Sequence, residues 1–269
     1  MQVIGITGGK GGVGKTNIAV NLSSAMSKAG LNVVLLDADL GMANVDVIMG
    51  LKAEFTLADV VTGNKTLDEI TLKSECGVRI IPAASGIPMM ADLTSEIRAN
   101  LIHAISSQVD PPDVLVVDTG AGIDQTVQTF VSACQRAIVV VCDEPASLTD
   151  AYALIKVLRL KKGYKQFEVI VNNAESPMQA KKLFERLSSV TEKHLDTQLS
   201  YLGAVPQDQY LKRAVQEQRP VLSAYPRSPS SLAIQDVAKK VLTSGHIHST
   251  SGGLTFFFEQ LLDIPADQV

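Results

Sequence analysis

The sequence contains no tryptophan and three cysteines among 269 residues, and aromatic residues make up 4% of it. Cys76, Cys134 and Cys142 are odd in number, widely spaced and set in apolar segments. A disulfide framework pairs its cysteines and a zinc site needs closely spaced ligands, so both are disfavoured. We expect free, mostly buried thiols in a reducing compartment.

The chain also lacks segments that would carry it into a membrane. Residues 1–7 have no basic start and no long apolar run, so no signal peptide is predicted, and no later apolar run approaches the roughly 18 residues of a spanning helix. The net charge of −4 gives no general attraction to nucleic acid or anionic lipid. Basic side chains gather at residues 156–165, but they fall at a predicted helix end, which favours a solvated surface over DNA binding. We expect a cytoplasmic protein.

Short apolar runs, rich in valine and isoleucine, alternate with longer helical stretches. Strands that are buried on both faces read as continuous apolar runs, so this rhythm predicts an α/β fold with a mostly parallel sheet and helices on both faces. We expect one domain over residues 1–242, a flexible linker over 243–253, and a C-terminal amphipathic helix and tail over 254–269. The predicted strands are Val3–Thr7, Val33–Asp37, Val78–Ile81, Val114–Asp118, Ala137–Cys142, Glu168–Asn172 and Tyr201–Val205.

A glycine-rich loop, "GGKGGVGKT" over residues 8–16, lies between the first predicted strand and a predicted helix. Its end fits the pattern GxxxxGKT, and strand, loop and helix are the context that a P-loop requires. The backbone N–H groups and the helix N-terminus favour phosphate, Lys15 neutralises the β and γ phosphates, and the Thr16 hydroxyl can bind Mg²⁺. The predicted nucleotide-binding residues of this loop are Gly11, Gly12, Val13, Gly14, Lys15, Thr16 and Asn17.

Carboxylates follow two of the other predicted strands. "VLVVDTGAG" places Asp118 at a strand end, where a P-loop enzyme holds a carboxylate near Mg²⁺, and Gly122 resembles a switch glycine that meets the γ phosphate. Asp37 and Asp39 follow the second strand on the same sheet edge. We expect Asp37 to hold the water shell of Mg²⁺ and Asp39 to accept the proton of the attacking water. Turn and capping roles stay open for these residues.

These motifs resemble a known family. "KGGVGKT" with its extra lysine, "DADLGMANVDVIMG" and the DxxxG switch are similar to the deviant Walker A ATPases of the MinD/ParA class. The segments "RIIPAASG", "VVVCDEPASLTDAYALIK", "LFERLSSVTEKHL" and "AYPRSPSSLAI" resemble that family's flagellar-number regulators, FleN/FlhG. The resemblance runs from residue 3 to about residue 262, and it implies a P-loop NTPase fold, bound ATP and Mg²⁺, and slow ATP hydrolysis.

The resemblance also assigns roles to single residues. Lys10 would reach across an ATP-sandwiched homodimer to the phosphates of the other subunit, so Lys10, Lys15 and Asp39 are the predicted catalytic residues. Thr16, Asp37 and Asp118 are the predicted Mg²⁺ ligands. Asp143, Glu144 and Pro145 would be interface or switch-coupled residues, with capping and turn roles still open.

The sequence also indicates which nucleotide base the protein binds. Guanine specificity in P-loop proteins usually rests on an Asn-Lys-x-Asp segment, and "VIVNNAES" lacks its lysine and aspartate, which favours ATP. The resemblance places Asn172 at the adenine edge, where its amide can donate and accept, together with Pro206 and Asp208. Ordinary turn chemistry stays open for Pro206 and Asp208.

The implied partners are an NtrC-type flagellar transcription activator, the FlhF GTPase and flagellar switch-complex proteins. Many flagellar relatives carry an N-terminal extension that activates FlhF, whereas this chain begins at its first predicted strand, which puts FlhF stimulation in doubt. Gly120 stands where these relatives commonly have alanine, which would loosen the switch loop.

The terminal segment "LTFFFEQLLD" has one apolar helical stripe. MinD relatives use such a helix for reversible membrane contact, here at the cytoplasmic face of the inner membrane. Glu259 stands on the polar face where membrane-binding helices carry lysine or arginine, so docking on protein stays equally open.

Two rival functions also remain: a division-site or DNA-partitioning ATPase of the same class, and a P-loop metabolic enzyme or reductase, which would need cluster-ligating cysteines.

Overall fold

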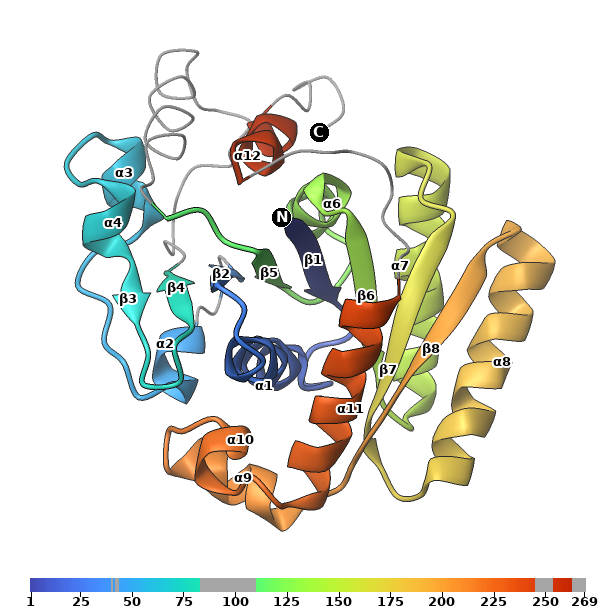
Figure 1. Ribbon diagram of the computed structural model, residues 1–269. Helices are drawn as coiled ribbons and strands as arrows, with labels where there is room; N and C mark the ends of the chain where they lie inside the picture. Colours follow the sequence, from blue (N-terminus) through green and yellow to red (C-terminus); the bar gives the residue numbers. More distant parts are fainter. Residues whose placement is uncertain (40, 42–43, 83–109, 245–253, 263–269) are drawn as a thin grey trace.

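A single twisted sheet organises the chain (Figure 1). The structure is a computed structural model, and it describes residues 1–39, 41, 44–82, 110–244 and 254–262. The sheet has eight strands in the order β3-β4-β2-β5-β1-β6-β7-β8, and all neighbours pair in parallel except β3 and β4. The strands are β1 (Gln2–Thr7), β2 (Val33–Ala38), β3 (Leu72–Lys73), β4 (Arg79–Ile81), β5 (Val114–Thr119), β6 (Arg136–Val141), β7 (Gln166–Ala174) and β8 (Gln198–Pro206).

Helices cover both faces of the sheet, and alternate strand residues serve the two faces. In β1, Ile4 and Ile6 pack in the cluster that contains α1 and α11, whereas Val3 packs in the cluster that contains α6. This period of two is expected of a strand that is buried on both sides. The described helices are α1 (Lys15–Lys28), α2 (Val45–Ile48), α3 (Leu57–Val61), α4 (Leu67–Ile70), α6 (Gln125–Ala133), α7 (Pro145–Lys162), α8 (Pro177–Leu195), α9 (Gln209–Gln216), α10 (Val221–Ala224), α11 (Pro229–Thr243) and α12 (Leu254–Leu262).

Local sequence sets several helix starts. α8 and α11 each begin with a Ser-Pro pair, in which the serine is the N-cap and the proline is the first helical residue. The Ser176 and Ser228 hydroxyls each accept an N–H from the third residue of their helix at 3.2 Å. Proline loses nothing at that position because its missing N–H would have no partner inside the helix.

The predicted fold class is confirmed, and each of the seven predicted strands is present. The structure adds β3, an antiparallel strand at the sheet edge. Sequence periodicity cannot reveal a strand of two residues. β7 and β8 are each longer than predicted because their ends carry polar residues, and such residues hide a strand from a search for apolar runs.

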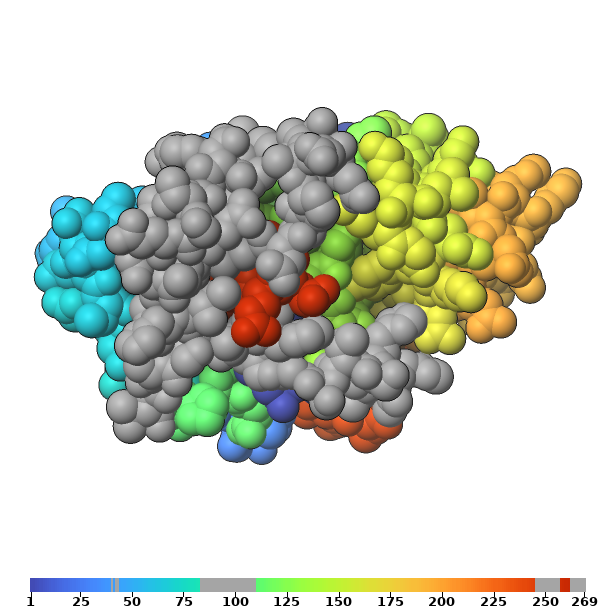
Figure 2. All heavy atoms as spheres, turned by 90° about the horizontal axis from the view of Figure 1, so that it is seen from above, coloured from blue at the N-terminus to red at the C-terminus, as the bar shows by residue number. Residues whose placement is uncertain are grey.

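The C-terminal helix α12 packs on the body of the protein. Phe257 and Phe258 are fully buried and Leu261 is nearly so, in the apolar cluster that also holds Phe130 and Ala133 of α6. Figure 2 views this end of the molecule, where α12 is seen in red. Residues 245–253 and 263–269, which include most of the predicted linker and the predicted tail, lie outside the described residues, so the division into domain, linker and tail stays a prediction. No helix in the described ranges combines the length and hydropathy needed to span a bilayer.

Candidate nucleotide-binding site

The loop between β1 and α1 has the backbone of a phosphate-binding loop. Gly14 is the N-cap of α1 with φ 91°, and Gly12 has φ 78°, both in the left-handed region that favours glycine. Gly14 is also limited by space, because a Cβ there would overlap the Asn172 amide. Lys15 and Thr16 therefore stand in the first turn of α1, where the free N–H groups of the helix and its dipole attract anions.

Lys15 and Asp118 are buried close to one another at this edge. Lys15 is 7% exposed, and burial lowers the pKa of its ammonium group, while the negative charges of Asp118 and Asp39 oppose that shift. Asp118 is 1% exposed, and burial raises its pKa to about 7 although the Thr16 hydroxyl donates to it. Neighbouring negative charges on Asp37 and Asp39 add to that rise. The site thus holds a buried acid and a buried base whose ordinary charges are disfavoured.

Asp37 stands directly beside Asp118, because the two residues are partners in the β2–β5 register. The Asp37 carboxylate accepts the backbone N–H groups of Asp39, Asn44 and Val45 at 3.0–3.1 Å. Burial raises the pKa of Asp37 to about 6, and these three hydrogen bonds work against the rise. Asp37 therefore both organises the loop after β2 and adds a carboxylate to the site.

Asp39 is half-buried, and its Oδ1 accepts the N–H of Gly41 at 3.2 Å. The carboxylate faces the loop after β5, where a Cβ on Gly120 would lie 3.6 Å from Asp39 Oδ1. The structure thus gathers all three predicted acidic residues at the edge that carries the phosphate-binding loop.

Unmet polar atoms test whether these residues fit Mg²⁺ and a nucleotide. The buried side-chain atoms without a hydrogen-bond partner among the described residues include Asp118 Oδ1, Thr7 Oγ1 and Asn17 Oδ1. Buried polar atoms normally find partners, so unmet ones around a phosphate-binding loop fit a site that a ligand completes. Carboxylate and hydroxyl oxygens are the ligands that Mg²⁺ prefers, and Thr16 with Asp118 supplies them.

The two groups that resemblance places nearest the γ phosphate are each held by the chain itself. The Lys10 ammonium pairs with the carboxylate of Glu144. Gly122 has φ 103°, and its N–H donates to the carbonyl oxygen of Gly8 at 3.1 Å. The switch loop therefore touches the phosphate-binding loop directly.

The predicted base-side residues occupy two different settings. Asn172 is buried, and its amide donates to the Val13 carbonyl at 2.8 Å, so the end of β7 is tied to the phosphate-binding loop. Pro206 ends β8 beside Ala174 in the strand register. Their adenine role stays a prediction.

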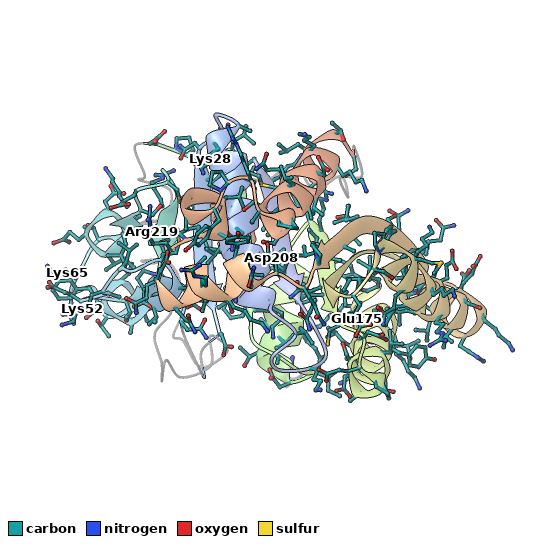
Figure 3. The ribbon with its side chains drawn as sticks, turned by 90° about the horizontal axis from the view of Figure 1, so that it is seen from below. Lys28, Lys52, Lys65, Glu175, Asp208 and Arg219 are labelled. Carbon is teal, nitrogen blue, oxygen red and sulfur yellow. The ribbon has the colours of Figure 1, made fainter. Side chains whose placement is uncertain are left out.

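Asp208 has a structural task that its sequence motif did not disclose. It is the N-cap of α9, with one carboxylate oxygen accepting the Tyr210 N–H at 2.8 Å. The other oxygen accepts the N–H and the hydroxyl of Ser230 at 3.0 and 2.6 Å. These bonds lower the pKa of Asp208 against the effect of burial. Figure 3, a view from below, labels Asp208 at the start of α9. The contacts favour the capping role, and the adenine role stays a prediction.

Sequence reasoning missed two features of the site. Thr7 ends β1 with a buried hydroxyl that has no hydrogen-bond partner among the described residues, and the available signal was a polar residue closing an apolar strand. Gly9 lies against α7, because a Cβ there would overlap the backbone of Asp150. That contact joins residues that are far apart in the chain, so local pattern carries no trace of it.

Among the described residues, cysteines and histidines do not gather at this edge. Cys134 and Cys142 are buried and Cys76 is half-buried, all as free thiols. In the part of the chain that the structure describes, no group of three or more His, Cys, Asp or Glu side chains is arranged to hold a metal ion. His246 and His248 lie outside the described residues.

Comparison with known proteins agrees with this geometry. Residues 1–242 match the ParA family, described as "NUBPL iron-transfer P-loop NTPase". The chain is 50% identical to antiactivator FleN of Pseudomonas aeruginosa, over 99% of this chain and 95% of that protein. It is 34% identical to the flagellum site-determining protein YlxH of Helicobacter pylori, over 97% and 90%. The solved structure of MinD complexed with Mg-ADP from Pyrococcus horikoshii matches with a TM-score of 0.68 and 25% identity, covering 89% of this chain and 95% of that one.

The family model spans residues 1–242, which include the phosphate-binding loop and the neighbouring carboxylates. The match to FleN covers almost the whole chain at half identity, which is well above what a shared fold alone produces. The chain belongs to the MinD/ParA family of P-loop NTPases, in the branch that holds FleN and FlhG.

Proposed function

We propose that this protein is a Mg²⁺-dependent ATPase that pairs with a second copy when it binds ATP and thereby restrains flagellar number. The observation that carries the proposal is the joint placement of Lys15, Thr16 and Asp118 beneath a phosphate-binding loop whose outer lysine, Lys10, has a 35% exposed side chain. The similarity to an antiactivator and to a flagellum site-determining protein supports the biological part.

The described side chains divide the work of phosphoryl transfer. Mg²⁺, when bound, would neutralise negative charge on the phosphates. Thr16 and Asp118 would hold it, Asp37 would hold its water shell, and Lys15 would balance the remaining phosphate charge. Asp39 would accept a proton as water attacks the γ phosphorus, and the bond from that phosphorus to the bridging oxygen would break to give ADP and phosphate.

The base would lie at the ends of β7 and β8. The Asn172 amide contacts the phosphate-binding loop through the Val13 carbonyl. A base held by Asn172 would therefore lie next to the loop that binds the phosphates. The Asn172 amide can donate and accept, which suits adenine, and the chain lacks the Asn-Lys-x-Asp segment of guanine-specific proteins. Competition between ATP and GTP for hydrolysis tests this assignment, and equal use of both would contradict it.

Lys10 would act across the dimer. A cation supplied by another subunit can stabilise transition-state charge by about 10³- to 10⁵-fold in the case of arginine fingers. We expect Lys10→Ala to abolish ATP-dependent dimerisation and hydrolysis while ADP still binds, whereas Lys15→Ala should lose nucleotide affinity itself. Size-exclusion chromatography with light scattering, in ATP and in ADP, measures the first effect. A Lys10→Ala protein that still dimerises and hydrolyses ATP normally would contradict the role.

The cellular role would be inhibition of an NtrC-type flagellar transcription activator, with FlhF and switch-complex proteins as further partners. γ-phosphate contacts order switch loops in related proteins and so convert nucleotide state into choice of partner. Deletion of the gene should increase flagellar number and activator-dependent transcription. Cells that keep both unchanged would overturn this part without touching the ATPase.

Membrane contact through α12 would require a rearrangement. Phe257, Phe258 and Leu261 lie in the core of the described structure, so they would have to leave it before meeting lipid. A liposome-flotation assay with ATP, comparing the full chain with a truncation after Thr243, tests this. Equal flotation of the two proteins would exclude a membrane role for α12.

A further inference from the structure

Glu144 holds the lysine that the proposed dimer needs. Glu144 is the N-cap residue of α7, yet its side chain makes no capping hydrogen bond. Its carboxylate instead pairs with the Lys10 ammonium of the phosphate-binding loop. The pairing lowers the pKa of Glu144 and raises the pKa of Lys10, as expected of two opposite charges in contact.

Neighbouring acids do not take this place. The adjacent carboxylate, Asp143, accepts a hydrogen bond from the Gln179 amide of α8. Asp150 of α7 acts on Lys10 through its charge alone, and it raises the pKa of Lys10 less than Glu144 does. Pro145 at the first helical position fixes the backbone that follows Glu144. The Lys10 contact is therefore a specific property of Glu144.

The pair is also weak enough to be exchanged. The Lys10 and Glu144 side chains are 35% and 55% exposed, and exposed ion pairs contribute little. A triphosphate carries more charge than one carboxylate, so it can draw Lys10 away, whereas ADP lacks the γ phosphate that Lys10 would meet. The switch loop makes a parallel contact, because the Gly122 N–H is bonded to Gly8 rather than free for a ligand.

We propose that Glu144 is a positioning residue that holds Lys10 within its own subunit, and that release of this contact sets the ATP concentration at which two copies pair. The inference rests on the proposed function, since it needs Lys10 to act across a dimer. Removing the carboxylate then frees Lys10 and favours pairing. If Glu144 instead guided Lys10 into the second subunit, removal of the carboxylate would weaken dimerisation. Whether dimerisation becomes stronger or weaker therefore distinguishes the two roles.

Glu144→Gln tests the proposal because it removes the charge and keeps the shape of the side chain. The measurement is light scattering during size-exclusion chromatography, with ATP and Mg²⁺ titrated at a fixed protein concentration. Each dimer contains two such contacts, so we expect the midpoint ATP concentration to fall by about 3- to 10-fold. The affinity for ADP should not change.

Glu175→Gln is the matched control. Glu175 is an exposed glutamate at the same edge of the sheet, labelled in Figure 3, and its replacement makes the same change in charge. It should leave the midpoint unchanged. In a Lys10→Ala background, Glu144→Gln should not restore ATP-dependent dimerisation, because the two side chains act through one contact.

The outcomes separate the inference from the proposed function. A wild-type protein that dimerises with ATP, and a Glu144→Gln midpoint that is unchanged or higher, would overturn the role of Glu144 alone. A wild-type protein that shows no ATP-dependent dimer would overturn both. ATP-dependent dimerisation that Glu144→Gln restores in the Lys10→Ala background would also overturn the inference, since Glu144 would then act elsewhere.

Discussion

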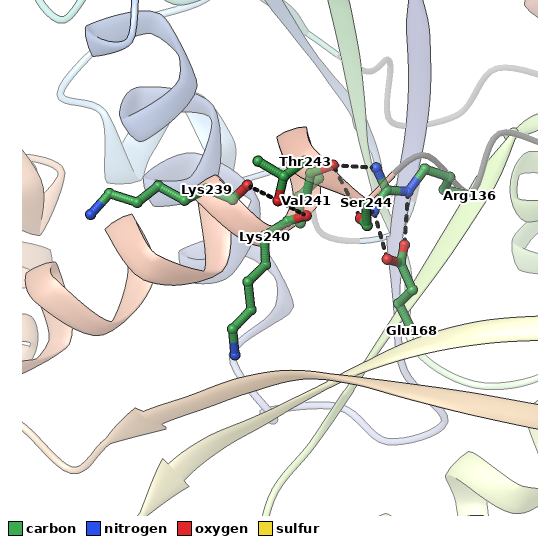
Figure 4. A network of polar contacts seen from close by, with 7 residues as sticks. All are labelled: Arg136, Glu168, Lys239, Lys240, Val241, Thr243 and Ser244. Atoms are coloured by element: carbon green, nitrogen blue, oxygen red, sulfur yellow. Dashed lines mark hydrogen bonds and ion pairs between the residues drawn. The ribbon is translucent and has the colours of Figure 1, made fainter.

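Two buried ionic sites lie at opposite edges of the sheet, and they are satisfied to different degrees. At the edge away from the phosphate-binding loop, Arg136 and Glu168 are 4% and 7% exposed and pair through two hydrogen bonds at 2.8 and 2.5 Å (Figure 4). Arg136 also donates to the Val241 carbonyl at 2.6 Å and to the Ser244 hydroxyl at 2.9 Å. It thereby joins β6, β7 and the end of α11.

At the nucleotide edge, the buried charged groups are less well satisfied by partners than Arg136 and Glu168 are. Asp118 keeps one buried oxygen without a partner among the described residues, and burial shifts the pKa values of Asp118 and Lys15 against their charged forms. A buried charge costs free energy unless it is paired and hydrogen-bonded, so a ligand that supplied the missing interactions at this edge would relieve that cost. Electrostatic destabilisation is therefore concentrated where binding can relieve it.

The largest effect is expected from breaking the satisfied pair. Arg136→Ala leaves the Glu168 carboxylate buried and unpaired, and such a loss destabilises a protein by about 3 to 5 kcal/mol. The melting temperature of the nucleotide-free protein should then fall by roughly 6 °C or more. The double variant Arg136→Met, Glu168→Leu removes both charges and should recover most of the loss. A double variant as unstable as the single one would contradict this account.

The second prediction is that removing a buried carboxylate at the nucleotide edge stabilises the protein instead of destabilising it. Burial raises the folded-state pKa of Asp118 from 3.8 to about 7, so folding favours the protonated acid, and its stabilising effect is lost as pH rises between these values. Asp118→Asn should stabilise the nucleotide-free protein by about 2 to 4 kcal/mol at pH 8, although it should abolish Mg²⁺-dependent hydrolysis.

Thermal unfolding in a metal chelator at pH 5 and pH 8 measures this effect. The difference in melting temperature between Asp118→Asn and the wild type should be larger at pH 8, where the ionised carboxylate is buried at a cost. A difference that is equal at both pH values, or a variant that is less stable at pH 8, would show that Asp118 is not the source of the destabilisation.

The third prediction concerns how the fold fixes the phosphate-binding loop. Gly9 lies against the backbone of α7, so the methyl group of Gly9→Ala must push the loop away from Asp150. Displacements on the order of 1 Å in a site cost up to about 100-fold in rate, so we expect kcat/KM for ATP hydrolysis to fall by about 10- to 100-fold. Gly11→Ala should cost less, because among the described residues a Cβ there would meet Ala121 alone, at 4.0 Å. Steady-state hydrolysis compares the two, and equal losses would contradict the contact-based explanation.

The sequence predicted the fold well because the strands at the centre of the sheet, β1, β2, β5 and β6, are buried on both faces. An apolar run such as Val114–Asp118 is typical of a buried strand. The glycine pattern before Lys15 is typical of a phosphate-binding loop. The residues that the sequence placed at one edge are indeed brought together, since Asp37 and Asp118 are register partners.

The sequence could not predict contacts that depend on three-dimensional approach. Glu144 carries no local sign that it meets Lys10, which lies on a different element, and Asp208 reads as a base-side residue until Ser230 is seen to hold its carboxylate. α12 is a further example, because an amphipathic stripe shows that one face is covered but not by what. In the structure the cover is α6 and its surrounding cluster.

The smallest effect is expected at Gly120, where the feature tested is the room beside the Asp39 carboxylate. A Cβ on Gly120 would lie 3.6 Å from Asp39 Oδ1 and 3.7 Å from Val127 Cγ2, which is ordinary contact, so alanine fits without displacing its neighbours. Gly120→Ala should change stability by less than about 1 kcal/mol and lower the freedom of Asp39. We expect kcat to change by no more than about 3-fold with KM unchanged, because the carboxylate itself is kept.

Steady-state hydrolysis by Gly120→Ala and by Ala121→Gly, which loosens the next position instead, makes the measurement two-sided. If loop freedom limits the rate, the two variants should move kcat in opposite directions. A change of more than about 10-fold in Gly120→Ala would mean that room around Asp39 is as necessary as its charge. The unmet interactions of the nucleotide edge would then include unfilled space as well as unpaired atoms.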